Sequence, residues 1–312
     1  MASPGPRGEY WGWAGGIDLY LAPTSQHGRA PMEGGGPPPG VAGLGSATDC
    51  FIEALRLIPP EAWERVVERE PEQGFLSLAL RLHRWEEALS LTLIAGLNDY
   101  QLRCRAEECY WPPLERVLRQ AGGDYKAALQ GMMEFYKSQP LGGQKLARMR
   151  RLLRSRLHWE ILTGQWSPQR LARELGVLHR RLGEAMGQRP EAKTIAFAAK
   201  LAAMLARLAG AGGVEVELPM PVDRRVEALS LCLEGRKMDA DSIRQLWSRL
   251  LRELKTAHPS LTMVELDSLA WQLAARLRGG AGDITEYFRE LGAPRVGESV
   301  ARCLGHCAGR GP

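Results

Sequence analysis

A chain of 312 residues, of which 45% are hydrophobic and 25% charged, has the composition of an ordinary globular protein with room for one large or two modest domains. No apolar run reaches the ~18 residues that a membrane span requires, because Lys200 and Arg207 interrupt the best candidate. The N-terminus lacks the compact apolar segment of a secretory signal. We therefore expect a cytoplasmic protein without membrane contact.

The first 46 residues differ in composition from the rest. The stretch EGGGPPPGVAGLGS (33–46) and the glycine-rich residues before it hold too few large apolar side chains to form a core. We expect residues 1–46 to be a disordered tail, or else to follow from a start codon assigned too far upstream, with Met32 as the true start.

From Ala47 onward, amphipathic helix patterns follow one another. Asp241 is typical of a helix start and Gly235 of a helix end. One short stretch, VEVELPMP (214–221), alternates like a strand but ends in proline. We expect an all-α domain of two helical lobes over 47–292 and a C-terminal extension over 293–312. The predicted helices are 48–57, 60–69, 74–96, 106–119, 124–137, 143–163, 168–185, 191–209, 222–234, 240–255, 261–277 and 282–291.

Basic residues are concentrated in one part of the chain. The stretch KLARMRRLLRSR (145–156) has six basic residues and no acid. Between Lys145 and Arg189, eleven Lys and Arg residues accompany three glutamates, a local balance of +8 in a chain whose net charge is +5. A solvated helix face normally mixes both signs, so this segment favours a polyanionic partner, nucleic acid first. A merely solubilising surface is the alternative.

The stretch GQRPEAKTIAF (187–197) joins two of the predicted helices through a tight turn. Gly187 permits a left-handed backbone, and the helix start that follows presents free N–H groups to which a nucleic-acid phosphate can bind. Lys193, Phe197 and Lys200 are spaced i, i+4, i+7 and therefore share one side of the second helix. An ordinary helical corner with two solvated lysines is the competing interpretation.

The stretch LPMPVDRRV (218–226) places Asp223 in the first turn of the next helix. An aspartate there is usually a helix cap worth ~1 kcal/mol. A lysine and a proline-fixed aspartate are also the groups that amine catalysis requires. Lysine attacks only when neutral, and its ordinary pKa of ~10.4 falls beside apolar and cationic neighbours such as Lys200. The carboxylate would relay protons or stabilise positive charge developing on a sugar.

The six cysteines are scattered and indicate no metal site. CLGHC (303–307) offers two cysteines and His306, but a complete site needs about four ligands and the sequence has no second cluster. Closely spaced cysteines that would bind an iron–sulfur cluster are also lacking. Whether any cysteines form disulfides stays open at this level.

Four stretches in order, GQRPEAKTIAFAAK (187–200), MPVDRRVEAL (220–229), LWSRL (246–250) and LDSLAW (266–271), resemble the archaeal 8-oxoguanine DNA glycosylases. That family belongs to the helix-hairpin-helix DNA glycosylases and combines glycosylase with lyase activity. The resemblance covers roughly residues 50–290. It implies that Lys193 is the Schiff-base nucleophile and Asp223 the catalytic aspartate. The base pocket that it implies contains Phe197, Lys200, Pro221, Asp267 and Trp271.

Two positions depart from the family pattern. A family glutamine has its counterpart in Gln73 of EPEQ (70–73), although one residue is inserted beside it. A family tryptophan corresponds to Trp111 by residue type and to Tyr110 by strict spacing within EECYW (107–111), so both remain candidates for substrate binding.

The resemblance thus predicts a nucleoid-associated DNA repair enzyme. It would excise 8-oxoguanine from double-stranded DNA through a lysine imine and β-elimination, as a monomer and without cofactor or metal. Asp267 and Trp271, at i and i+4, would receive the flipped base. A related glycosylase for another lesion and a non-catalytic DNA-binding helical protein are the alternatives. The residues expected to contact the DNA backbone are Lys145, Arg148, Arg151, Gly187 and Arg189.

Overall fold

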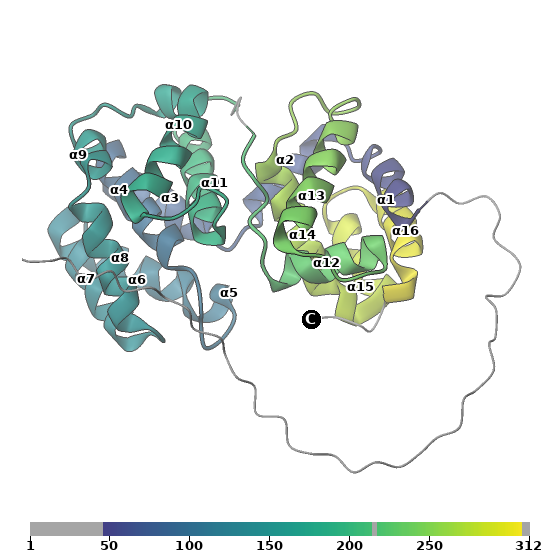
Figure 1. The fold of residues 1–312 in the computed structure, drawn as a ribbon, viewed down its shortest axis with the longest axis horizontal. Helices are drawn as coiled ribbons and strands as arrows, with labels where there is room; N and C mark the ends of the chain where they lie inside the picture. The colour runs from purple at the N-terminus through teal and green to yellow at the C-terminus, as the bar shows by residue number, and fades with distance from the viewer. Residues whose placement is uncertain (1–45, 214–216, 308–312) are drawn as a thin grey trace, which may run out of the picture. The chain divides into compact units, whose positions relative to one another are not determined.

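The computed structural model describes residues 46–213 and 217–307, and within these ranges the secondary structure is helical. No residue of the described ranges lies in a strand, which confirms the all-α class. The expected tail, apart from Ser46, and the start of the strand-like stretch 214–221 lie outside these ranges. The helices are α1 Ala47–Leu55, α2 Pro60–Glu68, α3 Gln73–Leu82, α4 Trp85–Asn98, α5 Ala106–Cys109, α6 Trp111–Ala121, α7 Tyr125–Ser138, α8 Gly142–Leu153, α9 Arg156–Leu162, α10 Pro168–Met186, α11 Lys193–Leu208, α12 Arg224–Glu234, α13 Ala240–Leu254, α14 Met263–Arg276, η1 Leu277–Gly279, α15 Gly280–Glu290, α16 Pro294–Cys303 and η2 Gly305–Cys307 (Figure 1).

Two long predicted helices are each divided in the structure. The predicted helix 74–96 breaks between α3 and α4, where the Glu87 carboxylate accepts a hydrogen bond from the Arg84 N–H at 3.3 Å. The predicted helix 143–163 breaks before α9, where Ser155 Oγ accepts from the His158 N–H at 3.1 Å. Hydrophobic periodicity continues across both breaks. It therefore conceals the caps at which a new helix begins.

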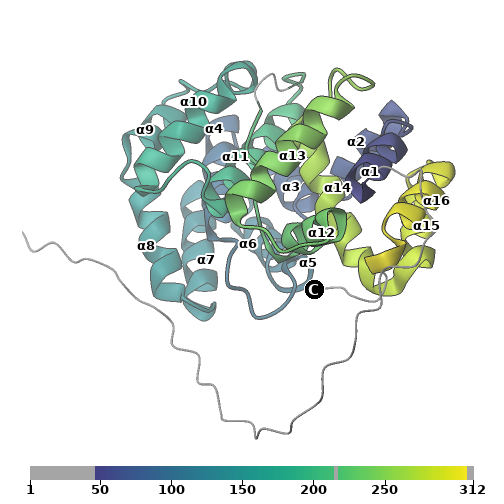
Figure 2. The same cartoon turned by 45° about the vertical axis from the view of Figure 1, so that its right-hand side comes forward.

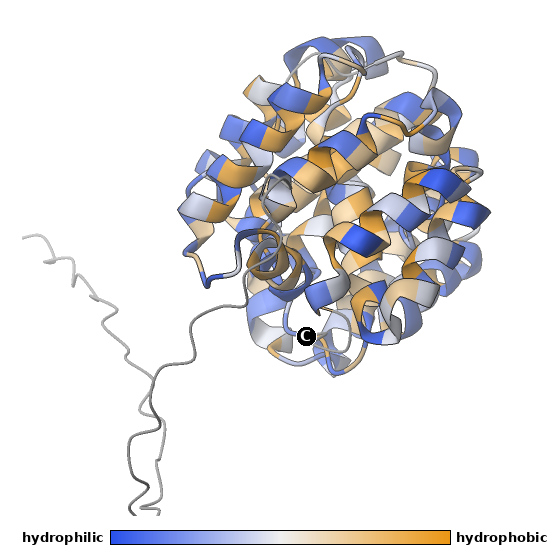
Figure 3. Ribbon diagram, turned by 90° about the vertical axis from the view of Figure 1, so that its right-hand side faces the viewer, coloured by the Kyte–Doolittle hydropathy of each residue, from blue (hydrophilic) through white to orange (hydrophobic). Residues whose placement is uncertain are grey.

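Helices α4 and α11 pack against each other, and both are largely buried. Every residue of α4 from Ala88 to Asn98 is buried. At the crossing, a Cβ added to Gly96 would come within 2.8 Å of the Ala198 Cα, so the two backbones approach closely because position 96 has no side chain. Figure 3 shows the hydrophobic turns of the helices facing one another and the hydrophilic turns facing outward.

The first and last described α-helices are neighbours. Figures 1 and 2 show α1 and α16 side by side, and a disulfide joins Cys50 of α1 to Cys303 of α16. A second disulfide joins Cys232 of α12 to Cys307. Both cysteines of CLGHC are thus paired in disulfides. The residues assigned to a C-terminal extension, 293–312, contain α16, which was not among the predicted helices and packs on α15 and α1. No helix in the ranges described is long and apolar enough to cross a bilayer.

Candidate active site

A pocket of about 370 Å³ opens between the start of α11, the residues before α12, the middle of α14 and the loop that follows α4. Seven of the residues predicted for catalysis or substrate binding line it: Lys193, Phe197, Lys200, Pro221, Asp223, Asp267 and Trp271. They come from three separate stretches of the chain. The fold therefore brings together, in one cavity, side chains that belong to separate sequence motifs.

Lys193 is the first residue of α11, and its position is fixed by the turn before it. Helix α10 ends at Met186 and is capped by Gly187, whose φ of 59° lies in the left-handed region that favours glycine. Arg148 of α8 then ties this turn to α4: its guanidinium donates to Gln188 Oε1 at 3.0 Å, to Thr194 Oγ1 at 2.7 Å and to the Leu97 carbonyl at 3.1 Å. Lys193 itself is half-buried and lines the pocket.

Asp223 caps α12. Its Oδ1 accepts hydrogen bonds from the N–H groups of Arg225 at 2.9 Å and Val226 at 3.0 Å. The capping interpretation is therefore correct, but capping and catalysis are compatible here. Both bonds use Oδ1, so the cap does not engage Oδ2, and the side chain lines the same pocket as Lys193.

A buried ion-pair cluster forms the floor of the pocket. Lys200 Nζ lies 2.6 Å from Asp267 Oδ2 and 3.5 Å from Glu70 Oε2, and all three side chains are nearly inaccessible to solvent. Burial alone would lower the pKa of Lys200, but the surrounding carboxylates of Asp267, Glu70 and Glu72 raise it above its ordinary value. Burial raises the pKa of Asp267 to about 6, although Lys200 acts in the opposite direction. Lys200 is thus a fixed cation rather than a mobile base.

Trp271 lines the cavity beside Arg225. The Arg225 guanidinium lies 3.7 Å from the centre of the indole ring, a cation–π contact, and Arg225 is itself paired with Glu107 at 2.9 Å. The covered face is unavailable for stacking. Phe197 contributes a second aromatic ring to the pocket wall.

Four acidic residues of the pocket were not predicted from the sequence: Glu70, Glu72, Asp99 and Glu107. Burial and the neighbouring negative charge of Glu70 raise the pKa of Glu72 well above its ordinary value. Two features of the sequence could have indicated this acidic group. Glu70 and Glu72 flank Pro71, and Asp99 directly follows the apolar run of α4. With them, six carboxyl groups and four basic side chains line the cavity, which makes it unsuited to a phosphate.

Comparison with known proteins identifies the family. The model of the AGOG family, described as N-glycosylase/DNA lyase, matches residues 52–300. The chain belongs to the AGOG family. Its fold also resembles the crystal structure of an 8-oxoguanine DNA glycosylase, Pa-AGOG from Pyrobaculum aerophilum, complexed with 8-oxoguanosine. The TM-score is 0.58 at 20% sequence identity, over 84% of this chain and 98% of the other. The protein is therefore an N-glycosylase/DNA lyase of the AGOG family.

Three residues expected to bind substrate do not line the pocket described above. Gln73, the first residue of α3, donates a hydrogen bond to the Val67 carbonyl of α2 at 2.9 Å. Tyr110 is fully buried and donates to the Ala95 carbonyl at 2.6 Å. Trp111 is also fully buried, with its ring centre 6.4 Å from that of Phe197, so it supports the pocket wall from behind. Spacing within the motif could not distinguish a lining residue from one packed directly behind it.

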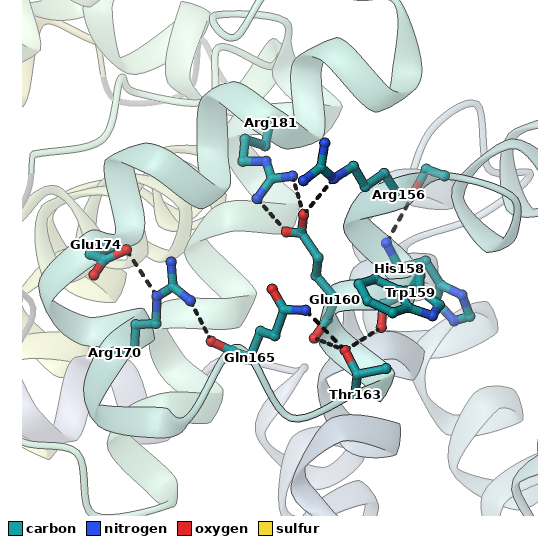
Figure 4. Close-up of polar contacts among 10 residues, drawn as sticks. Arg156, His158, Trp159, Glu160, Thr163, Gln165, Arg170, Glu174 and Arg181 are labelled. Carbon is teal, nitrogen blue, oxygen red and sulfur yellow. Dashed lines mark hydrogen bonds and ion pairs between the residues drawn. The ribbon is translucent and has the colours of Figure 1, made fainter.

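The basic segment 145–189 is less uniform than its charge indicates. Lys145 is fully buried, so the prediction that it contacts the DNA backbone is wrong. Glu160 accepts from both Arg156 and Arg181 and thereby joins α9 to α10 (Figure 4), while Arg170 pairs with Glu174 at 3.0 Å. Arg148 is half-buried and engaged as described above. The exposed positions of the predicted set are Arg151, Gly187 and Arg189.

Proposed function

We propose that this AGOG-family enzyme excises 8-oxoguanine from double-stranded DNA through a covalent lysine intermediate. One observation carries the proposal: Lys193 and Asp223 line the same cavity as Trp271. The family activity supplies the reaction type, and the likeness to the Pyrobaculum enzyme supports the choice of base.

Binding would begin at the turn between α10 and α11, which we infer to be a DNA-binding hairpin. Its exposed residues Gly187 and Arg189 and the nearby Arg151 would hold the phosphate backbone. The damaged nucleotide would then flip out at a cost of a few kcal/mol and enter the cavity between the helices that carry Lys193 and Trp271.

Recognition of the base would use its new hydrogen-bond donor. 8-Oxoguanine differs from guanine in carrying a hydrogen on N7, and the carboxyl-rich pocket offers acceptors for it. Normal guanine would leave such a buried acceptor unpaired, at a cost of about 1–3 kcal/mol. An excess of carboxyl groups would also stabilise the positive charge that develops on the sugar as the glycosidic bond breaks.

The chemical step would start with the neutral Lys193 amine. Its lone pair forms a bond to C1′ while the bond to the base breaks, and the base leaves with the electron pair and takes up one proton. Opening of the sugar ring gives the imine, and β-elimination of the 3′ phosphate then cuts the strand. Asp223, oriented by its cap on α12, would stabilise the cationic sugar.

Reduction of the imine with borohydride tests this function. On a duplex with one 8-oxoguanine, the wild type should give a covalent protein–DNA adduct and Lys193→Gln should give none. Lys126→Gln is the matched control, because Lys126 is exposed on α7. Duplexes containing normal guanine or an oxidised pyrimidine should give no adduct. An adduct that persists in Lys193→Gln would exclude Lys193 as the nucleophile.

A further inference from the structure

Asp99 lies at the C-terminal end of α4, and its side chain lines the pocket that holds Lys193 and Asp223. Only 9% of the residue is exposed. A carboxylate beside the last carbonyls of a helix is destabilising by about 0.3–1 kcal/mol, because the helix dipole places negative charge there. The stability of α4 therefore gives no reason for an aspartate at this position.

Two basic side chains of α8, the buried Lys145 and the half-buried Arg148, hold the backbone around Asp99 in place. Lys145 Nζ donates to the carbonyls on either side of it, Asn98 at 3.0 Å and Tyr100 at 2.8 Å. One turn further along α8, Arg148 bonds the Leu97 carbonyl and the hydroxyl of Thr194, the residue after Lys193. The same helix thus fixes the end of α4 and the start of α11 relative to each other. Residues predicted to hold DNA instead position two pocket side chains.

The surroundings of Asp99 suit a group that exchanges protons near neutral pH. Burial raises the pKa of Asp99 to about 6, while the ammonium groups of Lys193 and Lys145 act in the opposite direction. No residue of the described ranges donates a hydrogen bond to its carboxylate, so neither oxygen is committed to a structural contact. The other charged or titratable groups that face it from neighbouring elements are Asp223, Glu107, Glu72, Tyr110 and Tyr136.

We propose that Asp99 is a second catalytic carboxylate, which takes a proton from the Lys193 ammonium and so produces the neutral amine. The inference rests on the proposed function in taking Lys193 as the nucleophile. One proton passes from Nζ to an Asp99 oxygen, the lone pair that remains forms the bond to C1′, and the electron pair of the broken glycosidic bond goes to the base. Asp99 then releases its proton as the base takes one up, so protons and charge balance.

This proposal divides the work between two aspartates. Asp223 is held by two backbone hydrogen bonds at the start of α12 and stabilises charge on the sugar. Asp99 carries the proton. The sequence indicated Asp223 alone for both roles. Asp99 was not identified because an aspartate that follows an apolar helix matches no catalytic motif.

Single-turnover excision of 8-oxoguanine between pH 5 and 10 tests the role of Asp99. The wild-type rate should fall as the pH drops through about 6, because only an ionised Asp99 accepts a proton. Asp99→Asn should be slower by about 100-fold at pH 7.5, and its rate should recover only at alkaline pH, where solvent deprotonates the amine. Asp99→Glu should retain an acid limb. Asp124→Asn, at an exposed helix cap, is the matched control and should behave as the wild type.

The outcomes separate the two proposals. A wild type without a Lys193-dependent borohydride adduct refutes the proposed function, whatever Asp99 does. A normal adduct together with wild-type rates and pH profile in Asp99→Asn refutes the role of Asp99 alone. A slower Asp99→Asn enzyme with an unchanged acid limb would show a structural role and also overturns it. If circular dichroism shows that Asp99→Asn is unfolded, Asp99→Glu decides instead. Its acid limb must be present but displaced along the pH axis from that of the wild type, and a limb at the wild-type position overturns the role of Asp99.

Discussion

Lys200 and Asp267 show how a single buried contact supports the pocket. Their 2.6 Å ion pair is almost completely removed from solvent, and Glu70 is the only other described carboxylate within ion-pair distance of Lys200. Buried pairs of this kind add little stability compared with apolar residues of the same volume. Loss of one partner is costly, however, because the other charge remains buried without compensation.

We therefore expect Asp267→Asn to lower the free energy of unfolding by about 3 kcal/mol, measured by urea denaturation at pH 7.5. Asp239→Asn, at an exposed cap of α13, should change it by less than about 0.5 kcal/mol, since asparagine caps helices as well as aspartate does. The triple variant Glu70→Gln/Lys200→Met/Asp267→Leu, which removes every charge of the ion-pair cluster, should recover most of the loss. Equal effects of Asp267→Asn and Asp239→Asn would show that the ion pair does not support the fold.

The sequence predicted the positions of the helices better than the burial and contacts of single side chains. Periodicity and caps are local, so the all-α class and most helix positions could be deduced from them. The sequence motifs also predicted the five residues on α11 and α14 that line the pocket: Lys193, Phe197, Lys200, Asp267 and Trp271. Burial depends on partners distant in sequence, and for that reason Lys145 looked like a DNA contact although it is fully buried. Asp99 could not be assigned because its surroundings come from α8 and α11, which are distant in sequence.

The crossing of α4 and α11 provides a test at this scale. An alanine side chain at position 96 would come within 2.8 Å of the Ala198 Cα and 3.1 Å of Leu201 Cδ1. Gly96→Ala should therefore cost about 1–2 kcal/mol of stability despite the better helix propensity of alanine. It should also slow excision, since these helices carry Asp99 and Lys193. Gly143→Ala, where an added Cβ meets nothing within 4 Å, should be neutral or slightly stabilising in the same thermal and kinetic assays.

Over the whole described part of the molecule, disulfides connect distant segments of the chain. Cys50 and Cys303 are separated by 253 residues, whereas the bond between Cys104 and Cys109, beside the pocket loop, spans a separation of five. A cross-link restricts the unfolded chain more strongly when it closes a longer loop. The long-range bond therefore has the larger expected effect on stability, and the short one acts on the local order of residues 104–109.

Removal of each bond by paired serine substitutions distinguishes these effects. Cys50→Ser/Cys303→Ser should lower the free energy of unfolding by about 4 kcal/mol, and Cys104→Ser/Cys109→Ser by no more than about 2 kcal/mol, because the entropy gained by the unfolded chain grows with the loop. Thermal unfolding with and without a reducing agent measures both. Reduction should lower the Tm of the wild type more than that of the Cys50→Ser/Cys303→Ser variant, which has already lost the long-range bond. Equal losses in the two double variants, or a wild-type Tm that does not respond to the reductant, would contradict a stabilising cross-link between α1 and α16.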